Sequence, residues 1–175
     1  VGTPHTLAAN YVWSFTTDLP PSVTTTTPAN GSTTFPSTDI TINFDEDVHA
    51  TTSSFTISCT TSGAHAFTLT GSPMAFFTLN PTSDFTGGET CTVTVIAAQI
   101  DDADSGDPPA NMTANYVFSF NIDAAPAVGS TLPANNATQV PANSDVLVTF
   151  TELVNASIAS FDITCMQSGL KNQYT

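Results

Sequence analysis

The chain has almost no positively charged side chains. It contains no arginine and one lysine, Lys171, against 15 aspartates and glutamates, and its formal net charge over 175 residues is −14. Proteins that bind nucleic acid need lysines and arginines to neutralise the phosphates. The same deficit disfavours adsorption to an anionic membrane surface. The sequence therefore excludes nucleic acid as a partner.

Long apolar runs and catalytic patterns are also missing. No run reaches the roughly 20 apolar residues of a membrane-spanning helix, so we expect no direct membrane insertion in this segment. The patterns GxSxG, HExxH and the P-loop, which accompany hydrolase, metalloprotease and nucleotide chemistry, do not occur. Hydrophobic residues nevertheless make up 40% of the chain, which disfavours intrinsic disorder. Because threonine, serine and asparagine must then supply the polar surface, we expect an extracellular or cell-surface protein.

The chain repeats itself. The stretch ANYVWSF at 9–15 returns as ANYVFSF at 114–120, and SSFTISC at 53–59 returns as ASFDITC at 159–165, at offsets of 105 and 106 residues. A period of this length has the size of an independent domain, not of a solenoid unit. The repeat predicts the C-terminal strand of a preceding domain in 1–17, a complete domain in 20–122 and the N-terminal part of a following domain in 126–175.

Short runs of alternating apolar and polar residues predict strands. Ile40, Ile42 and Phe44 face one way, with polar residues between them, as in a half-buried strand. Six further strands are predicted between turns rich in glycine, proline and serine: 23–27, 55–59, 67–69, 77–79, 91–97 and 116–120. About seven strands in about 100 residues predict an all-β, Greek-key, immunoglobulin-like sandwich. Trp13 and Phe118 are equivalent in the last strand, and both are expected in the core.

Two of the three cysteines lie inside the complete repeat. Cys59 ends one predicted strand and Cys91 begins another, while Cys165 is the second copy of Cys59. In an immunoglobulin-like sandwich these two strands are neighbours in one sheet. We therefore expect a Cys59–Cys91 disulfide within a sheet, with two buried free thiols as the alternative, and a partner for Cys165 beyond residue 175. Without CxxC or HxxxH spacing, zinc is disfavoured.

The ordered motifs resemble a known family. PANGSTTFPSTDITINFDEDV at 28–48 is followed by SFTISC, CTVTV and NYVFSF, and its opening pattern recurs at 133–154. This set is similar to the bacterial Ig-like domains that occur in tandem in S-layer, adhesin and other large exported proteins. The resemblance implies a passive structural or spacer role, often with calcium at inter-strand or inter-domain loops, and no catalysis.

Calcium is the one cofactor that the residues themselves suggest. Calcium takes about six to eight oxygen ligands on a flexible loop, and the stretch IDDADSGDPP offers a candidate set: Asp101, Asp102, Asp104 and Asp107. The alternative is a solvated loop whose aspartates make local turns.

A second acidic stretch, Asp45, Glu46 and Asp47, follows a predicted strand, and both stretches could serve one interdomain ion. Only Glu46 recurs, as Glu152, which predicts a structural role in which it accepts backbone N–H groups. The histidines are isolated in the sequence and are expected at the surface: His5, His49 and His65.

Two linkers and a threonine run lie at the boundaries of the predicted domains. Short, proline-containing linkers at 16–23 and 121–128 predict a semi-rigid string of domains. A threonine run is a candidate O-glycan site: Thr24, Thr25, Thr26 and Thr27.

We expect an extracellular stalk, fibre or filament whose partners are neighbouring Ig-like repeats or identical subunits. Subunits would join by strand complementation, with residues 1–17 as the added strand. One alternative is an adhesin or carbohydrate-binding accessory repeat. A third reading is an enzyme that uses the Asp101–Asp107 loop with a metal.

Overall fold

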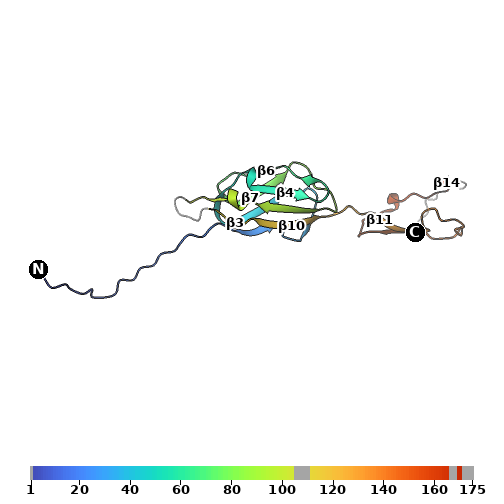
Figure 1. Cartoon of the computed structure of the whole chain (residues 1–175). Coiled ribbons are helices and arrows are strands. Elements are labelled where there is room, and N and C mark those ends of the chain that lie inside the picture. The colour runs from blue at the N-terminus through green and yellow to red at the C-terminus, as the bar shows by residue number, and fades with distance from the viewer. Residues whose placement is uncertain (1, 105–110, 166–168, 171–175) are drawn as a thin grey trace. The chain divides into compact units, whose positions relative to one another are not determined.

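The computed structural model describes residues 2–104, 111–165 and 169–170, and it divides into two compact units, Val1–Ala124 and Ala125–Thr175 (Figure 1). In the described residues the regular structure is strands and three short 3-10 helices. Among those residues no helix has the length and apolarity that a bilayer crossing requires. The predicted all-β class is confirmed.

Two five-stranded sheets form the sandwich of the first unit. One sheet has the order β1-β3-β7-β6, with β9 also paired to β3, and the other has the order β2-β10-β8-β4-β5. The first sheet contains β1 (Val23–Thr27), β3 (Ile40–His49), β6 (Phe67–Leu69), β7 (Met74–Pro81) and β9 (Asp101–Asp102). The second contains β2 (Thr33–Thr34), β4 (Phe55–Cys59), β5 (Gly63–Ala64), β8 (Thr90–Val95) and β10 (Tyr116–Ile122). The 3-10 helices η1 (Thr52–Ser54) and η2 (Ala97–Gln99) precede β4 and follow β8.

The alternating residues of the two sheets meet in one core. Phe77 of β7 has no exposed surface, and its ring centroid lies 6.0 Å from that of Phe44 on β3 and 5.8 Å from that of Phe55 on the opposite sheet. Phe118 of β10 is buried as expected. Burying a side chain of this size stabilises the fold by about 1.5–3 kcal/mol, so the inward-facing rows hold the two sheets together.

The chain enters and leaves the sandwich at opposite ends (Figure 1). Val23, the first residue of β1, lies opposite Phe44, in the half of β3 that ends beside β9. Ile122, the last residue of β10, lies opposite Thr34, whose hydroxyl is 2.6 Å from that of Thr38, just before β3 begins. Since β3 runs from one end to the other, the segment before β1 and the segment after β10 lie at opposite ends of this sandwich.

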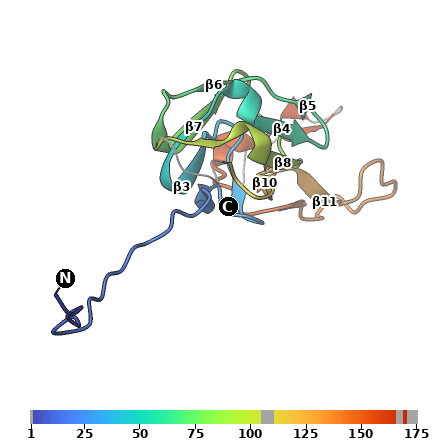
Figure 2. The ribbon, with the colours of Figure 1, turned by 60° about the vertical axis from the view of Figure 1, so that its left-hand side comes forward.

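The segment before β1 departs from expectation. No strand is formed between residues 2 and 22, and the trace is extended (Figure 2). Trp13 is 68% exposed and stacks on Phe15, with ring centroids 5.3 Å apart, so its placement in the core was wrong. The difference in burial between Trp13 and Phe118 comes from strand pairing. Phe118 is buried because β10 lies between β2 and β8, whereas residues 9–15 pair with no strand in the described part of the chain.

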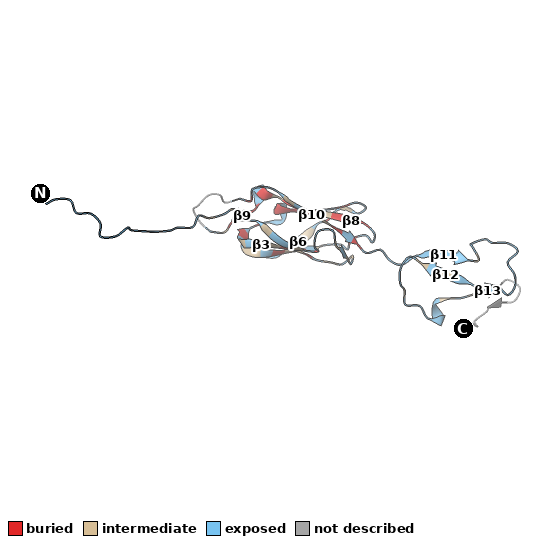
Figure 3. Cartoon of the chain, turned by 90° about the horizontal axis from the view of Figure 1, so that it is seen from below, coloured by how far each residue is buried: buried red, intermediate tan, exposed pale blue. Residues whose placement is uncertain are grey.

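The second unit repeats the strand pairing found at the N-terminal side of the first unit's sandwich. β11 (Val128–Leu132) pairs with β12 (Leu147–Phe150), and Val128 opposite Phe150 repeats Val23 opposite Phe44. The helix η3 (Ile158–Ser160) has a capping box equivalent to that of η1, with Ser157 in place of Thr51 as the N-cap residue. β13 (Thr164–Cys165) pairs with β14 (Gly169–Leu170). The described side chains of this unit are mostly exposed (Figure 3).

Candidate functional site

Four carboxylates meet at the end of the sandwich where the chain enters. Asp18 comes from the segment before β1, Glu46 from β3, Asp102 from β9, and Asp104 lies two residues beyond. One carboxylate oxygen of each lies within 4.8 Å of those of the other three. These four residues, the acidic cluster, come from segments that lie far apart in the sequence.

Backbone pairing explains how the cluster is assembled. β9 pairs with the end of β3, where Val48 lies opposite Asp102. The segment before β1 is fixed to the same strand by Ser22, whose N–H and hydroxyl both donate to the Asp45 carboxylate at 2.7 Å. The Asp45 N–H returns a bond to the Ser22 carbonyl at 3.1 Å. The Asp45 carboxylate therefore binds Ser22 and fixes the linker to β3. The carboxylate of its neighbour Glu46 lies close to those of Asp18, Asp102 and Asp104.

Burial makes the cluster electrostatically costly. Asp102 is 7% exposed, and its Oδ1 accepts the Asp104 N–H at 2.9 Å. Its Oδ2, like Oδ2 of Asp18, is buried with no hydrogen-bond partner among the described residues. An unpaired buried charge is expensive, and no hydrogen-bond donor among the described residues offsets that cost at either oxygen.

The charges also act on one another. Burial, together with the negative charges of Asp102 and Asp18, raises the pKa of Glu46 to about 7. Asp45 behaves in the opposite way. Burial raises its pKa, but the hydrogen bonds from Ser22 outweigh burial and hold the pKa below its usual value. The chain offers no arginine, and its one lysine, Lys171, lies outside the described residues, so no arginine or lysine of the described part offsets the cluster.

The cluster overlaps the predicted calcium loop only in part. Asp102 and Asp104 belong to it, but the Asp101 side chain instead accepts a hydrogen bond from the Asn111 amide. Asp107 lies outside the described residues. Glu46, which was expected to cap backbone N–H groups, joins the aspartates, and the sequence did not point to Asp18 at all. A signal was present, because Asp18 recurs as Asp123 just as Glu46 recurs as Glu152.

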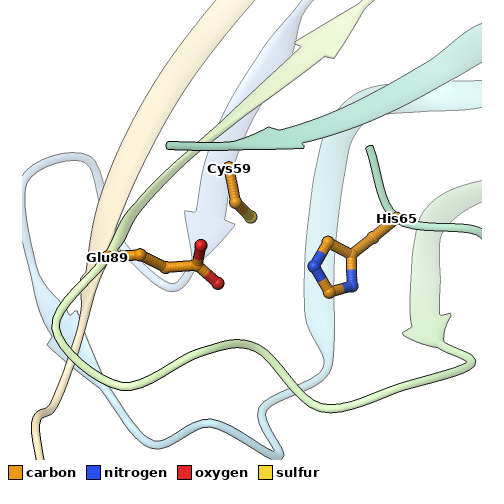
Figure 4. Close-up of side chains that lie close together, drawn as sticks. All are labelled: Cys59, His65 and Glu89. Atoms are coloured by element: carbon orange, nitrogen blue, oxygen red, sulfur yellow. The ribbon is translucent and has the colours of Figure 1, made fainter. Parts of the chain in front are cut away.

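A second polar group surrounds Glu89, in the turn before β8 (Figure 4). Glu89 is 2% exposed, and its carboxylate accepts the N–H groups of Thr86 at 2.6 Å, Ser62 at 2.9 Å and Thr61 at 3.1 Å. The Ser62 hydroxyl also donates to it at 2.7 Å. Burial raises the pKa of Glu89, but these bonds dominate and lower it below its usual value. Glu89 therefore ties the turn after β4 to the turn before β8.

His65 completes this group and is not at the surface as expected. It is 8% exposed, its ring centroid lies 4.7 Å from that of Phe85, and its Nε2 lies 2.7 Å from the Ser62 hydroxyl oxygen. Since that hydroxyl donates its proton to Glu89, Nε2 must donate to the hydroxyl oxygen. In a catalytic serine–histidine pair the imidazole accepts the proton and the acid contacts the imidazole. Here the acid contacts the serine, so this trio is a structural network.

Cys59 and Cys91 form a disulfide in the structure, with an S–S distance of 2.01 Å. They lie directly opposite one another on β4 and β8, within one sheet. The Thr60 N–H donates to the Thr90 carbonyl at 3.0 Å, which makes Cys59 and Cys91 a non-hydrogen-bonded pair, in which side chains approach closest. Although Cys59 lies close to His65 and Glu89, its sulfur is bonded and supplies no thiolate ligand.

The threonine run proposed to carry glycans forms β1, at the edge of its sheet. Thr24, Thr25 and Thr27 are exposed, while Thr26 is partly buried and donates its hydroxyl to the Pro28 carbonyl at 3.0 Å. Glycosylation of the exposed threonines remains a prediction.

The chain belongs to the family of bacterial Ig-like domains, whose model matches residues 18–121 and again 122–175. No curated protein matches the chain in sequence. Among solved structures it is similar to CopC from Methylosinus trichosporium OB3b, with 14% identity, a TM-score of 0.39, and coverage of 58% of this chain and 92% of that one. It is also similar to the N-terminal part of the bacterial S-layer protein SbsC, with 15% identity, a TM-score of 0.44, and coverage of 65% of this chain and 28% of that one. The S-layer protein rSbsC(31-844) gives 16% identity, a TM-score of 0.43, and coverage of 65% and 16%.

Proposed function

We propose that the chain is part of an exported surface protein in which tandem Ig-like domains form a stalk, fibre or filament. The observation that carries the proposal is the position of the two linkers, which join the sandwich at opposite ends. A domain whose linkers lie at one end would fold back on its neighbour. Linkers at opposite ends instead make each further repeat extend the string, on the order of 40 Å per sandwich by strand length plus turns.

The linkers are held close to the domains on both sides. The Asp123 N–H donates to the Thr34 carbonyl at 2.8 Å, at the end of the first sandwich. Ala127 exchanges two bonds with Thr151, at 3.0 and 2.8 Å, just before β11. This pair repeats the Ser22–Asp45 clamp at the equivalent positions. Only the short stretch 124–126 lies between the two anchors, which supports a semi-rigid string over a floppy one.

Export is supported by the disulfide between Cys59 and Cys91. Disulfides persist in oxidising compartments and are rare in the cytosol. The hollow of about 480 Å³ in the second unit is lined mainly by apolar side chains, such as Val148, Ile158 and Phe161, with Asp162 as its one titratable group.

Immuno-electron microscopy of intact cells tests the proposal, with antibodies raised against the folded sandwich. We expect labelling outside the cell envelope without permeabilisation. Labelling that requires lysis would contradict an exported surface role.

The identity of the partners is part of the proposal. Residues 9–15 nearly copy the sequence of β10, and Tyr11, Val12, Trp13 and Phe15 are all exposed. They are suited to complete the last strand of another sandwich, in a neighbouring repeat or in an identical subunit. Native mass spectrometry of the chain distinguishes the two. Oligomers that dissociate in a Trp13→Asp variant support strand complementation between subunits, and monomers at all concentrations exclude it.

An adhesin or carbohydrate-binding repeat is the second candidate. It is favoured by two aromatic side chains on the complete sandwich that face solvent, Phe35 and Phe76. A glycan array tests it directly. Specific binding that is lost in Phe35→Ala or Phe76→Ala would support adhesion over a passive spacer.

A further inference from the structure

We propose that Asp18, Glu46, Asp102 and Asp104 form a calcium site that fixes the chain entering the sandwich to β3 and β9. The proposal goes beyond the spacer role and does not depend on it, because a spacer can be stiff or flexible at its junctions.

The spacing of the oxygens suits a single ion. Calcium binds oxygen at about 2.3–2.6 Å, so two of its ligands lie at most about 5 Å apart. One oxygen from each of the four carboxylates satisfies that limit toward the other three, within 4.8 Å. Four ligands from the protein leave room for the second carboxylate oxygens and for water to complete a coordination number of about six to eight.

Two carboxylate oxygens of the acidic cluster are buried and have no hydrogen-bond donor among the described residues. Asp102 is buried, its Oδ1 is occupied by the Asp104 N–H, and its Oδ2 has no partner in the described part of the chain. Asp18, on a different segment, has a second such oxygen. Buried carboxylate oxygens are ordinarily satisfied by hydrogen bonds or by a metal ion. A cation among these side chains would satisfy both at once.

The kind of ligand selects the kind of ion. All four ligands are carboxylates, and such hard oxygen donors suit calcium, magnesium and manganese, while zinc and copper favour nitrogen or sulfur. Four carboxylates drawn from a linker, two strands and a loop make a site of irregular geometry. Calcium tolerates this arrangement, and magnesium, which demands a near-ideal octahedron, does not.

The repeat offers independent support. Asp18 and Glu46 recur as Asp123 and Glu152, whereas the acidic neighbours Asp45 and Asp47 are replaced by Thr151 and Leu153. If the acidic stretch served only solubility, there would be no reason for its middle member alone to return. In the complete sandwich the two recurring residues, Asp18 and Glu46, come from the linker and from β3, and their carboxylates lie together.

The mechanical consequence follows from where Asp18 lies. The Ser22–Asp45 clamp fixes the linker at one point, about which the preceding residues can pivot. An ion that bridges Asp18 to β3 and β9 adds a second anchor and removes that pivot. Calcium would therefore stiffen the junction, and its removal would loosen it.

Calorimetric titration of the chain with calcium chloride, compared across charge-matched variants, tests the site. Asp102→Asn and Glu46→Gln each remove one charge from the cluster. Asp47→Asn removes one charge from the same strand at an exposed position, and Asp101→Asn removes one from the loop beside it. Hydrogen exchange of residues 12–22, with calcium and with magnesium, reports the linker.

We expect calcium to bind with a dissociation constant on the order of 10⁻⁴–10⁻³ M, and to slow exchange in the linker more than magnesium does. Asp102→Asn and Glu46→Gln should weaken binding at least about tenfold, and Asp47→Asn less than about twofold. In EDTA the two cluster variants should melt no lower than wild type, because they relieve repulsion, and this shows that they fold. Absence of binding at about 10 mM calcium, equal weakening by Asp47→Asn, or loss only in Asp101→Asn would overturn the proposal.

Discussion

Removing the Cys59–Cys91 disulfide should cost the first domain a large part of its stability. The two cysteines are 32 residues apart in the sequence. In the chain-entropy model a loop of that length lowers the entropy of the unfolded chain by about 12.4 cal/mol/K. At 25 °C this corresponds to about 3.7 kcal/mol in the free energy of unfolding. For a domain of about 100 residues, such a loss lowers Tm by about 15–30 °C.

Guanidinium and thermal unfolding, followed by circular dichroism, measure this loss. A Cys59→Ala/Cys91→Ala variant should be compared with the parent chain, both carrying Cys165→Ala so that no third thiol exchanges. The reduced parent serves as a control, because it lacks the bond but keeps both sulfur atoms in the core. A loss below about 1 kcal/mol in the variant and in the reduced parent would refute the loop-closure reasoning.

Three other predictions concern the core and the Glu89 network. Glu89→Gln should lower the free energy of unfolding by about 2–4 kcal/mol, because its amide would face an N–H donor, while the exposed Asp39→Asn changes it little in urea unfolding. The folded-state pKa of Glu89 lies below its usual value, so its stabilisation is complete above the unfolded pKa and is lost as pH falls through the folded pKa. Glu89→Gln lacks this acid dependence, so the difference in the free energy of unfolding between wild type and the variant should shrink as pH falls. Phe77→Ala should cost about 3–5 kcal/mol, and the adjacent Phe76→Ala, at a position 49% exposed, should cost less than about 1 kcal/mol in the same assay.

The fold could be predicted because each long strand carries its own signal. Runs such as Ile40–Ile42–Phe44 alternate with polar residues, and the structure buries that row against the opposite sheet. The two-residue strands β2, β5 and β9 are too short to show alternation. The acidic residues of β3 hid its full length, because a run of three charges does not resemble a strand, although its backbone pairs with β9 through Val48.

The candidate site could be predicted only in part, because its members are brought together by pairing that lies outside any local pattern. Asp102 and Asp104 were found since they are close in sequence. In the sequence, most of the sandwich separates Asp18 from Asp102 and Asp104. Asp18 lies near them in space only because Ser22 fixes the linker to β3 and β9 pairs with β3. Glu89 was missed for a related reason: one glutamate in a glycine turn is normally solvated, and its donors at Thr61 and Ser62 come from a different turn.

Negative-stain electron microscopy of the native, unproteolysed protein tests most directly the proposal that tandem Ig-like domains form a stalk, fibre or filament. The account predicts straight or gently curved rods or fibres with an axial repeat on the order of 40 Å, set by one sandwich and its linker. Compact particles, or beads that fold back on one another with no regular spacing, would contradict it.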